Sequence, residues 1–91
     1  FSVDRSLGQG SWLDYGMFLQ SVMVAARGRG LDTCPQAAFM RFHRIIMAHI
    51  GAPPEQMLVC GMSLGHADAA ATANRLVTVR EPVASFARFL N

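Results

Sequence analysis

The residues with the clearest potential for chemistry lie in the segment Gly30–Phe39, GLDTCPQAAF, between two strongly apolar stretches. A glycine exit, a short extended run, a proline turn and an alanine-rich start predict a strand that leads directly into a helix. The first backbone N–H groups of a helix have no partner within it, so they can bind an electron-rich or anionic ligand. Composition alone favours the plainer alternative, a strand-to-helix corner that binds nothing.

Other residues that could carry chemistry are poorly placed for it. His43 and His49 are six residues apart rather than four, and no carboxylate completes a zinc site. Cys34 precedes Pro35 but has no local histidine that could activate it as a nucleophile. We therefore expect no catalytic side chain and no metal site, which suits chemistry performed by a cofactor that the protein orients.

A long helix is expected to precede the segment Gly30–Phe39. Ser11 and Asp14 have the spacing of a capping box, which predicts a helix from Ser11 to about Arg27, ended by Gly28 or Gly30. Because this helix is apolar around its whole circumference, we expect it to be buried.

The rest of the chain is predicted to mix helices and strands. We expect a strand end at 1–3, a helix at 37–50 that stops at Gly51, a buried strand at 56–64, a surface loop at 68–74, an extended stretch at 75–79 and a last helix at 83–90.

Composition indicates that this chain does not stand alone. Its 91 residues are 52% apolar and 15% charged, against about 25% charged in an average domain. A domain of this size buries only about 60–65% of its unfolded surface, so the apolar side chains exceed what its own core can absorb. We expect a piece of a larger polypeptide, an obligate oligomer, or both.

Charge and cysteine content exclude several classes of partner. The net charge of +2 reflects eight arginines that are scattered along the chain, whereas the basic residues of a nucleic-acid-binding surface would be clustered. The longest uncharged apolar stretch, Tyr15–Ala26, is too short to span a bilayer. Two cysteines 26 positions apart indicate reduced thiols. We expect a cytoplasmic protein that binds neither nucleic acid nor membrane.

Four motifs follow one another along the chain. They are GSWLDYG at 10–16, with Gln20 and Ala25–Ala26 after it; GLDTCPQ at 30–36; VCGMSLGHAD at 59–68; and NRL at 74–76 with REPV at 80–83. Their order and spacing resemble the second half of the FMN-dependent nitroreductase family, and the similarity covers essentially the whole chain.

The resemblance implies a fold and an activity. The fold would be α+β and nitroreductase-like, a mixed or antiparallel sheet flanked by helices in an intertwined homodimer, with residues 1–91 as the C-terminal portion of a single domain. The activity would be that of an oxidoreductase that passes a hydride from NAD(P)H through FMN to a small-molecule electron acceptor such as a nitroaromatic or a quinone.

The resemblance also implies which residues contact the flavin. Ala37 and Ala38 match positions whose backbone faces the flavin ring, with Pro35 and Gln36 beside them, and Arg75 matches a position that binds the FMN phosphate. The family's second basic residue there is replaced by Ala73. Because the family's other FMN contacts precede Phe1, we expect this chain by itself to be inactive. A non-catalytic apolar dimerisation or scaffold module remains the alternative.

Overall fold

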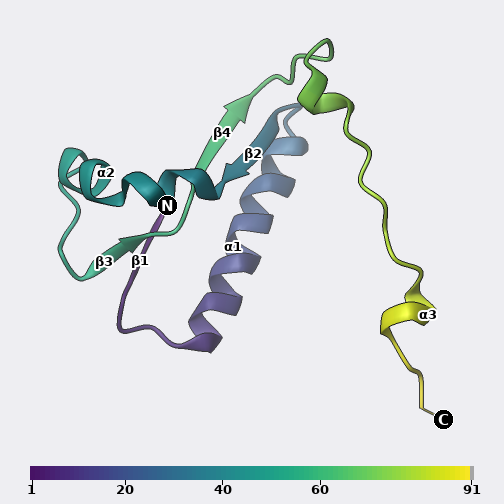
Figure 1. Cartoon of the computed structure of the whole chain (residues 1–91), viewed down its shortest axis with the longest axis horizontal. Helices are drawn as coiled ribbons and strands as arrows, with labels where there is room; N and C mark the ends of the chain where they lie inside the picture. Colours follow the sequence, from purple (N-terminus) through teal and green to yellow (C-terminus); the bar gives the residue numbers. More distant parts are fainter. Residues whose placement is uncertain (91) are drawn as a thin grey trace.

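The computed structural model describes residues 1–90 and combines short strands with helices (Figure 1). The elements, in chain order, are β1 (Ser2–Asp4), α1 (Gln9–Arg27), β2 (Asp32–Gln36), the 3₁₀ helix η1 (Ala37–Phe42), α2 (His43–His49), β3 (Gln56–Leu58), β4 (Gly61–Gly65), the 3₁₀ helix η2 (Thr72–Arg75) and α3 (Val83–Phe86).

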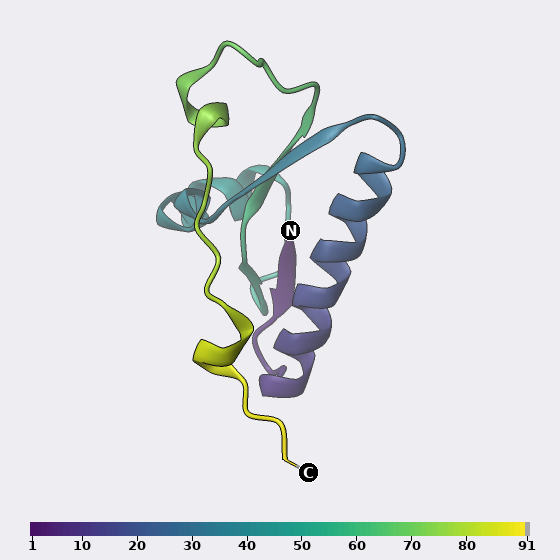
Figure 2. The same cartoon turned by 90° about the vertical axis from the view of Figure 1, so that its right-hand side faces the viewer.

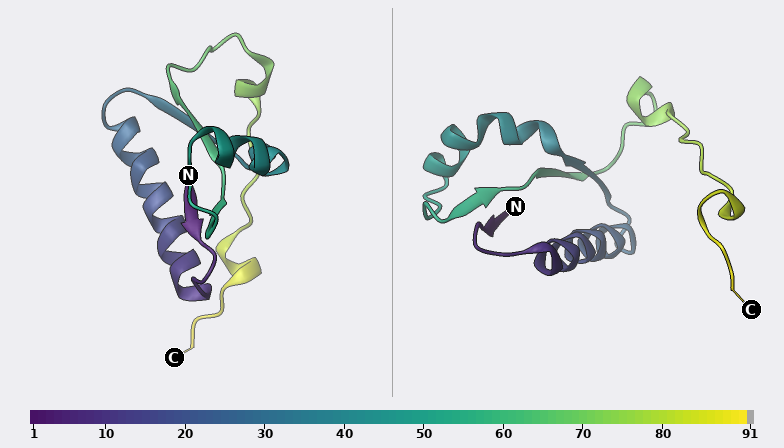
Figure 3. Two further views of the ribbon diagram at one scale, coloured as in Figure 1. Left: turned by 90° about the vertical axis from the view of Figure 1, so that its left-hand side faces the viewer. Right: turned by 60° about the horizontal axis from the view of Figure 1, so that its bottom comes forward.

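The strands form two antiparallel ribbons, β1 with β3 and β2 with β4. Helix α1 lies on one side of them, and η1 and α2 lie on the other (Figure 3). This arrangement confirms the α+β fold with an antiparallel, helix-flanked sheet. The buried apolar residues among residues 1–90 are few: Val3 of β1, Leu58 of β3, Cys60 between β3 and β4, and Ala26 near the end of α1.

The single buried strand predicted at 56–64 is wrong. The run is divided because β3 pairs with β1 and β4 pairs with β2. Val59 and Cys60, which link the two strands, bond to the first residue of the chain. The Val59 N–H donates to the Phe1 carbonyl at 2.9 Å, and the Phe1 nitrogen donates to the Cys60 carbonyl at 3.1 Å.

The predicted end of the first helix is confirmed, whereas its predicted start is not. Helix α1 ends at Arg27, and Gly30 follows with a φ of 74°, the left-handed geometry that suits glycine. The helix begins at Gln9 after an extended Gly8, so Ser11 lies inside its first turn rather than at its cap position. No side chain caps this helix start.

The burial expected for α1 is wrong for the described part of the chain. Ala26 is its only buried residue, and Leu13, Met17, Phe18 and Val24 are each more than half exposed. Figure 2 shows the helix running along one flank, with its outer side uncovered. A helix that is apolar on all sides is expected to be covered by other residues, but the pattern does not say whether those residues belong to the same chain or to another one.

The predicted helix at 37–50 is confirmed in extent and forms in two parts, η1 and α2. Helix α2 ends at His49, and Gly51, two residues later, has a φ of 64°.

Beyond β4 the chain leaves the ribbons and forms an exposed arm. The loop predicted at 68–74 contains the start of η2, residues 76–82 form no regular element, and the helix predicted at 83–90 is limited to α3. The arm projects away from the other elements (Figure 3, right). The radius of gyration is accordingly 16.9 Å, against about 12 Å for a compact domain of this length.

Candidate functional site

The strand-to-helix junction predicted from the sequence is present. Helix α1 closes with the Leu31 N–H bonded to the Ala26 carbonyl at 3.0 Å. The chain then extends as β2 and passes without a loop into η1. In the ribbon Pro35 lies opposite Met62, and β2 has no second neighbour among residues 1–90, so Pro35 lies in an edge strand, where proline is tolerated.

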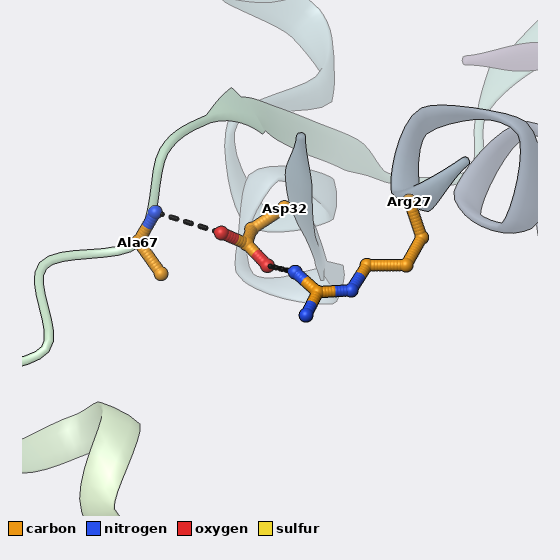
Figure 4. Close-up of polar contacts among 3 residues, drawn as sticks. All are labelled: Arg27, Asp32 and Ala67. Atoms are coloured by element: carbon orange, nitrogen blue, oxygen red, sulfur yellow. Dashed lines mark hydrogen bonds and ion pairs between the residues drawn. The ribbon is translucent and has the colours of Figure 1, made fainter. Parts of the chain in front are cut away.

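Asp32 fixes the beginning of β2 to two other parts of the chain (Figure 4). Arg27 at the end of α1 donates through Nη1 to Asp32 Oδ1 at 2.7 Å, and the Ala67 N–H after β4 donates to Asp32 Oδ2 at 2.9 Å. One carboxylate therefore ties the helix, the strand and the following loop together. Both partners of the ion pair are exposed, which limits its contribution to stability to about 0.2–1 kcal/mol.

The four junction residues proposed as flavin contacts lie next to one another on an accessible part of the molecule. Pro35, Ala37 and Ala38 are exposed, and Gln36 is half-buried. No side chain caps the start of η1 at Gln36. The Ser63 hydroxyl of β4 instead donates to Gln36 Oε1 at 3.2 Å. The small side chains of the alanines leave their backbone open to a flat ligand.

An apolar hollow of about 290 Å³ opens beside this junction. It is lined by Gln36, Ala38, Phe39 and Phe42, so one side of η1 supplies nearly all of its wall. Two phenylalanine rings and an alanine suit a planar aromatic ligand by shape and by polarity.

Arg75 is not brought to the junction. It lies in η2, is exposed, and donates through Nη2 to the Ala70 carbonyl at 3.1 Å. Its segment follows β4, beyond the end of the ribbon where Asp32 pairs with Gly65, whereas Gln36 pairs with Gly61 at the other end. At about 3.3 Å per residue, these two ends are about 13 Å apart. Only an elongated ligand could touch both.

A second cleft, of about 340 Å³, lies at the Arg75 end of the ribbon. Asp32, Cys34, His66 and Asn74 are among the residues that line it, and Asn74 is the immediate neighbour of Arg75. The start of β2, the end of β4 and the loop after β4 form its walls. It provides space beside the proposed phosphate contact.

The histidines and cysteines considered in the sequence do not assemble. Within residues 1–90 no group of three His, Cys, Asp or Glu side chains could hold a metal ion. Cys34 is exposed and Cys60 is buried, both as free thiols. The His43 ring is occupied locally, with Nδ1 3.2 Å from the Met40 carbonyl.

Sequence reasoning missed two contacts that shape the site. One is the Asp32 link, for which no local pattern exists. The other is the close approach of Phe39 to Gly61. An interior glycine in an apolar strand pattern was the signal for the second, because such a glycine often marks a close approach of another group.

Fold and site define this chain as an α+β structure with antiparallel ribbons and an open strand-to-helix junction. It belongs to the nitroreductase family, whose sequence profile matches residues 4–66. Among the residues described, no helix combines the length and hydrophobicity needed to cross a membrane.

Curated relatives match nearly the whole chain. It is 49% identical over 90 residues to a 4-nitrobenzoate reductase of Pseudomonas putida, covering 99% of this chain and 40% of that protein. It is 42% identical over 91 residues to a chloronitrobenzene nitroreductase of Comamonas testosteroni, covering 100% of this chain and 40% of the relative. The chain thus spans about two fifths of the length of these relatives.

A solved structure shows the same fold. The FMN- and NADPH-dependent nitroreductase NfnB from sphigopyxis sp. strain HMH aligns with a TM-score of 0.91 at 32% identity. The alignment covers 99% of this chain and 40% of NfnB.

Proposed function

We propose that this chain is the C-terminal portion of a single nitroreductase domain that acts as an FMN-dependent oxidoreductase on nitroaromatics or similar electron-poor acceptors. Support comes from relatives that are named for the reduction of nitrobenzoate and chloronitrobenzene, and from NfnB, which is FMN- and NADPH-dependent. Bound FMN would supply the hydride chemistry, taking a hydride from NAD(P)H and passing it to the acceptor.

The observation that carries the proposal is the open junction at Gln36–Ala38 beside an apolar hollow. We assign the backbone of Pro35, Gln36, Ala37 and Ala38 to the flavin ring. Small side chains permit close contact, and N–H groups aimed at the ring would stabilise the negative charge that reduction leaves on it. No general acid or base is required of these residues, since their role is to hold and orient the ring.

Arg75 is assigned to the FMN phosphate. Its guanidinium can hold a phosphate through two parallel hydrogen bonds, and only Nη2 has a protein partner among the described residues, the Ala70 carbonyl. The ribityl chain of FMN separates the ring from the phosphate, which suits contacts at opposite ends of one ribbon.

We propose that the working unit is a cytoplasmic homodimer and that this chain supplies only part of each site. The apolar side chains of α1 and of the arm are exposed, among them Met17, Phe18, Phe86 and Phe89. Exposed apolar area on this scale is typical of a surface that another chain covers. For the same reason the chain alone is expected neither to bind FMN tightly nor to turn over.

Reconstitution of the full-length polypeptide tests this function. The purified protein should be yellow or take up FMN, and the bound flavin should bleach with NADPH and recover when a nitroaromatic is added. The alternative, a non-catalytic dimerisation or scaffold module, is favoured by the same exposed apolar surface. A colourless protein that cannot be reconstituted with FMN would support that alternative.

A further inference from the structure

Gly61 occupies a position in β4 where no side chain fits. A Cβ atom built there would lie 2.5 Å from Cδ2, 2.7 Å from Cε2 and 3.1 Å from Cγ of Phe39. The backbone of Gly61 is not left-handed, since Gly30 and Gly51 are the glycines with positive φ in the described residues. The requirement for glycine here is therefore one of space.

The residues that meet at Gly61 lie at the two ends of the segment proposed to face the flavin, Gln36–Ala38. Gln36 lies opposite Gly61 in the ribbon, and Phe39, the third residue of η1, places its ring over the same glycine. The residues Gln36–Ala38 are thus held at both ends against one position of β4. The Ser63 bond to Gln36, two residues along the strand, holds the first of these ends in place.

An added methyl group could not be accommodated by a turn of the ring alone. Rotation about χ2 moves Cδ2 and Cε2 of Phe39 but leaves Cγ where χ1 and the backbone place it, within 3.1 Å of the new atom. Relief would require a change in χ1 or a displacement of η1. Either response alters the hollow, because Phe39 is one of its four lining residues.

We propose that Gly61 is a positioning residue: by leaving room for the Phe39 ring against β4, it sets the place of the Gln36–Ala38 backbone relative to the flavin. This inference rests on the proposed function. Gly61 itself would touch no ligand. It would act on FMN through the backbone of Gln36–Ala38, because a displacement of about 1 Å in groups that position a ligand is costly to binding and reactivity.

The test uses the full-length polypeptide with the variants Gly61→Ala, Gly65→Ala, Phe39→Ala and Gly61→Ala/Phe39→Ala. Gly65 is the matched control, a glycine of the same strand whose added Cβ would meet nothing within 4 Å. Each variant is measured for FMN affinity, for the visible absorption and reduction potential of its bound flavin, and for thermal stability.

Gly61→Ala should weaken FMN binding about tenfold, equivalent to about 1.4 kcal/mol, and should shift the absorption and potential of the bound flavin. Gly65→Ala should match the parent. Because alanine removes the ring together with Cγ, the double variant should return to within about threefold of Phe39→Ala alone. Such a rescue would not follow if Gly61 served strand stability only.

The inference is overturned if Gly61→Ala lowers the melting temperature while FMN affinity, absorption and potential stay at parental values. If Gly61→Ala does not fold, Phe39→Ala decides, because loss of the ring contact should shift the flavin absorption of a folded protein, and an unshifted band refutes the inference. A parent that binds no FMN refutes the proposed function itself, and the inference with it, before any variant is made.

Discussion

Replacement of Arg75 by alanine tests the phosphate assignment most directly. The side chain is exposed and, within residues 1–90, has one hydrogen bond to protein, from Nη2 to the Ala70 carbonyl at 3.1 Å. Its remaining N–H groups have no partner in that part of the chain and could bind a phosphate. A hydrogen bond to a charged group contributes about 1.5–3 kcal/mol, and the exposure of Arg75 places it at the low end. We expect Arg75→Ala to weaken FMN binding about tenfold, since 1.4 kcal/mol corresponds to a factor of ten.

The assay is a fluorescence titration of the full-length apoprotein with FMN and, in parallel, with riboflavin, which lacks the phosphate. Arg75→Ala should weaken the binding of FMN and leave that of riboflavin unchanged, and added salt should reduce the difference. Arg29→Ala is the matched control, because that side chain is also exposed and also donates to a backbone carbonyl, that of Ala25 at 3.2 Å. Equal losses for both flavins, or no loss with FMN, would refute the assignment.

Three further changes test contacts and backbone geometry of the fold by thermal denaturation of the full-length polypeptide. Asp32→Asn should lower stability by about 0.2–1 kcal/mol, because it removes an ion pair with Arg27 whose side chains are 74% and 39% exposed; a loss that persists in 1 M salt would contradict this reading. Tyr15 donates to the Ser2 carbonyl at 3.2 Å, and burial raises its pKa above the ordinary value of 10.0. The folded state therefore favours the neutral phenol. The contribution of Tyr15 to the free energy of unfolding is complete below pH 10 and is lost as the pH rises through the folded-state pKa. Tyr15→Phe should remove this loss of stability at alkaline pH, and an unchanged dependence of stability on pH would argue against the assignment. Gly51→Ala should cost about 1–2 kcal/mol because of the left-handed backbone there, whereas parental stability would show that the helix end relaxes freely.

Features fixed by local chemistry could be predicted from the sequence. Gly30 and Gly51 end helices with φ values of 74° and 64°, which few other residues adopt, so both ends were identifiable. The strand-to-helix junction followed from glycine and proline at defined positions. The start of α1 was missed because its cap, Gly8, offers no side chain to recognise.

Features that depend on distant partners could not be predicted. The apolar run 56–64 has no internal sign of where it divides, because the division is set by pairing with β1 and β2, more than 20 residues earlier. The all-round hydrophobicity of α1 predicts burial but not whether the cover comes from the same chain. The separation of Arg75 from Ala37 depends on the length of the β2–β4 ribbon.

The link between the two ribbons has a mechanical consequence. Only Val59 and Cys60 join β3 to β4. The register of β4 on β2 is therefore coupled to the register of β3 on β1. A slip of β4 by one residue would turn its side chains to the opposite face and would carry Gly61 away from its place opposite Gln36. The short link opposes such a slip, because it would have to displace β3 along β1 as well. An insertion between Leu58 and Gly61 would therefore uncouple the ribbons and release the junction without altering any residue of it.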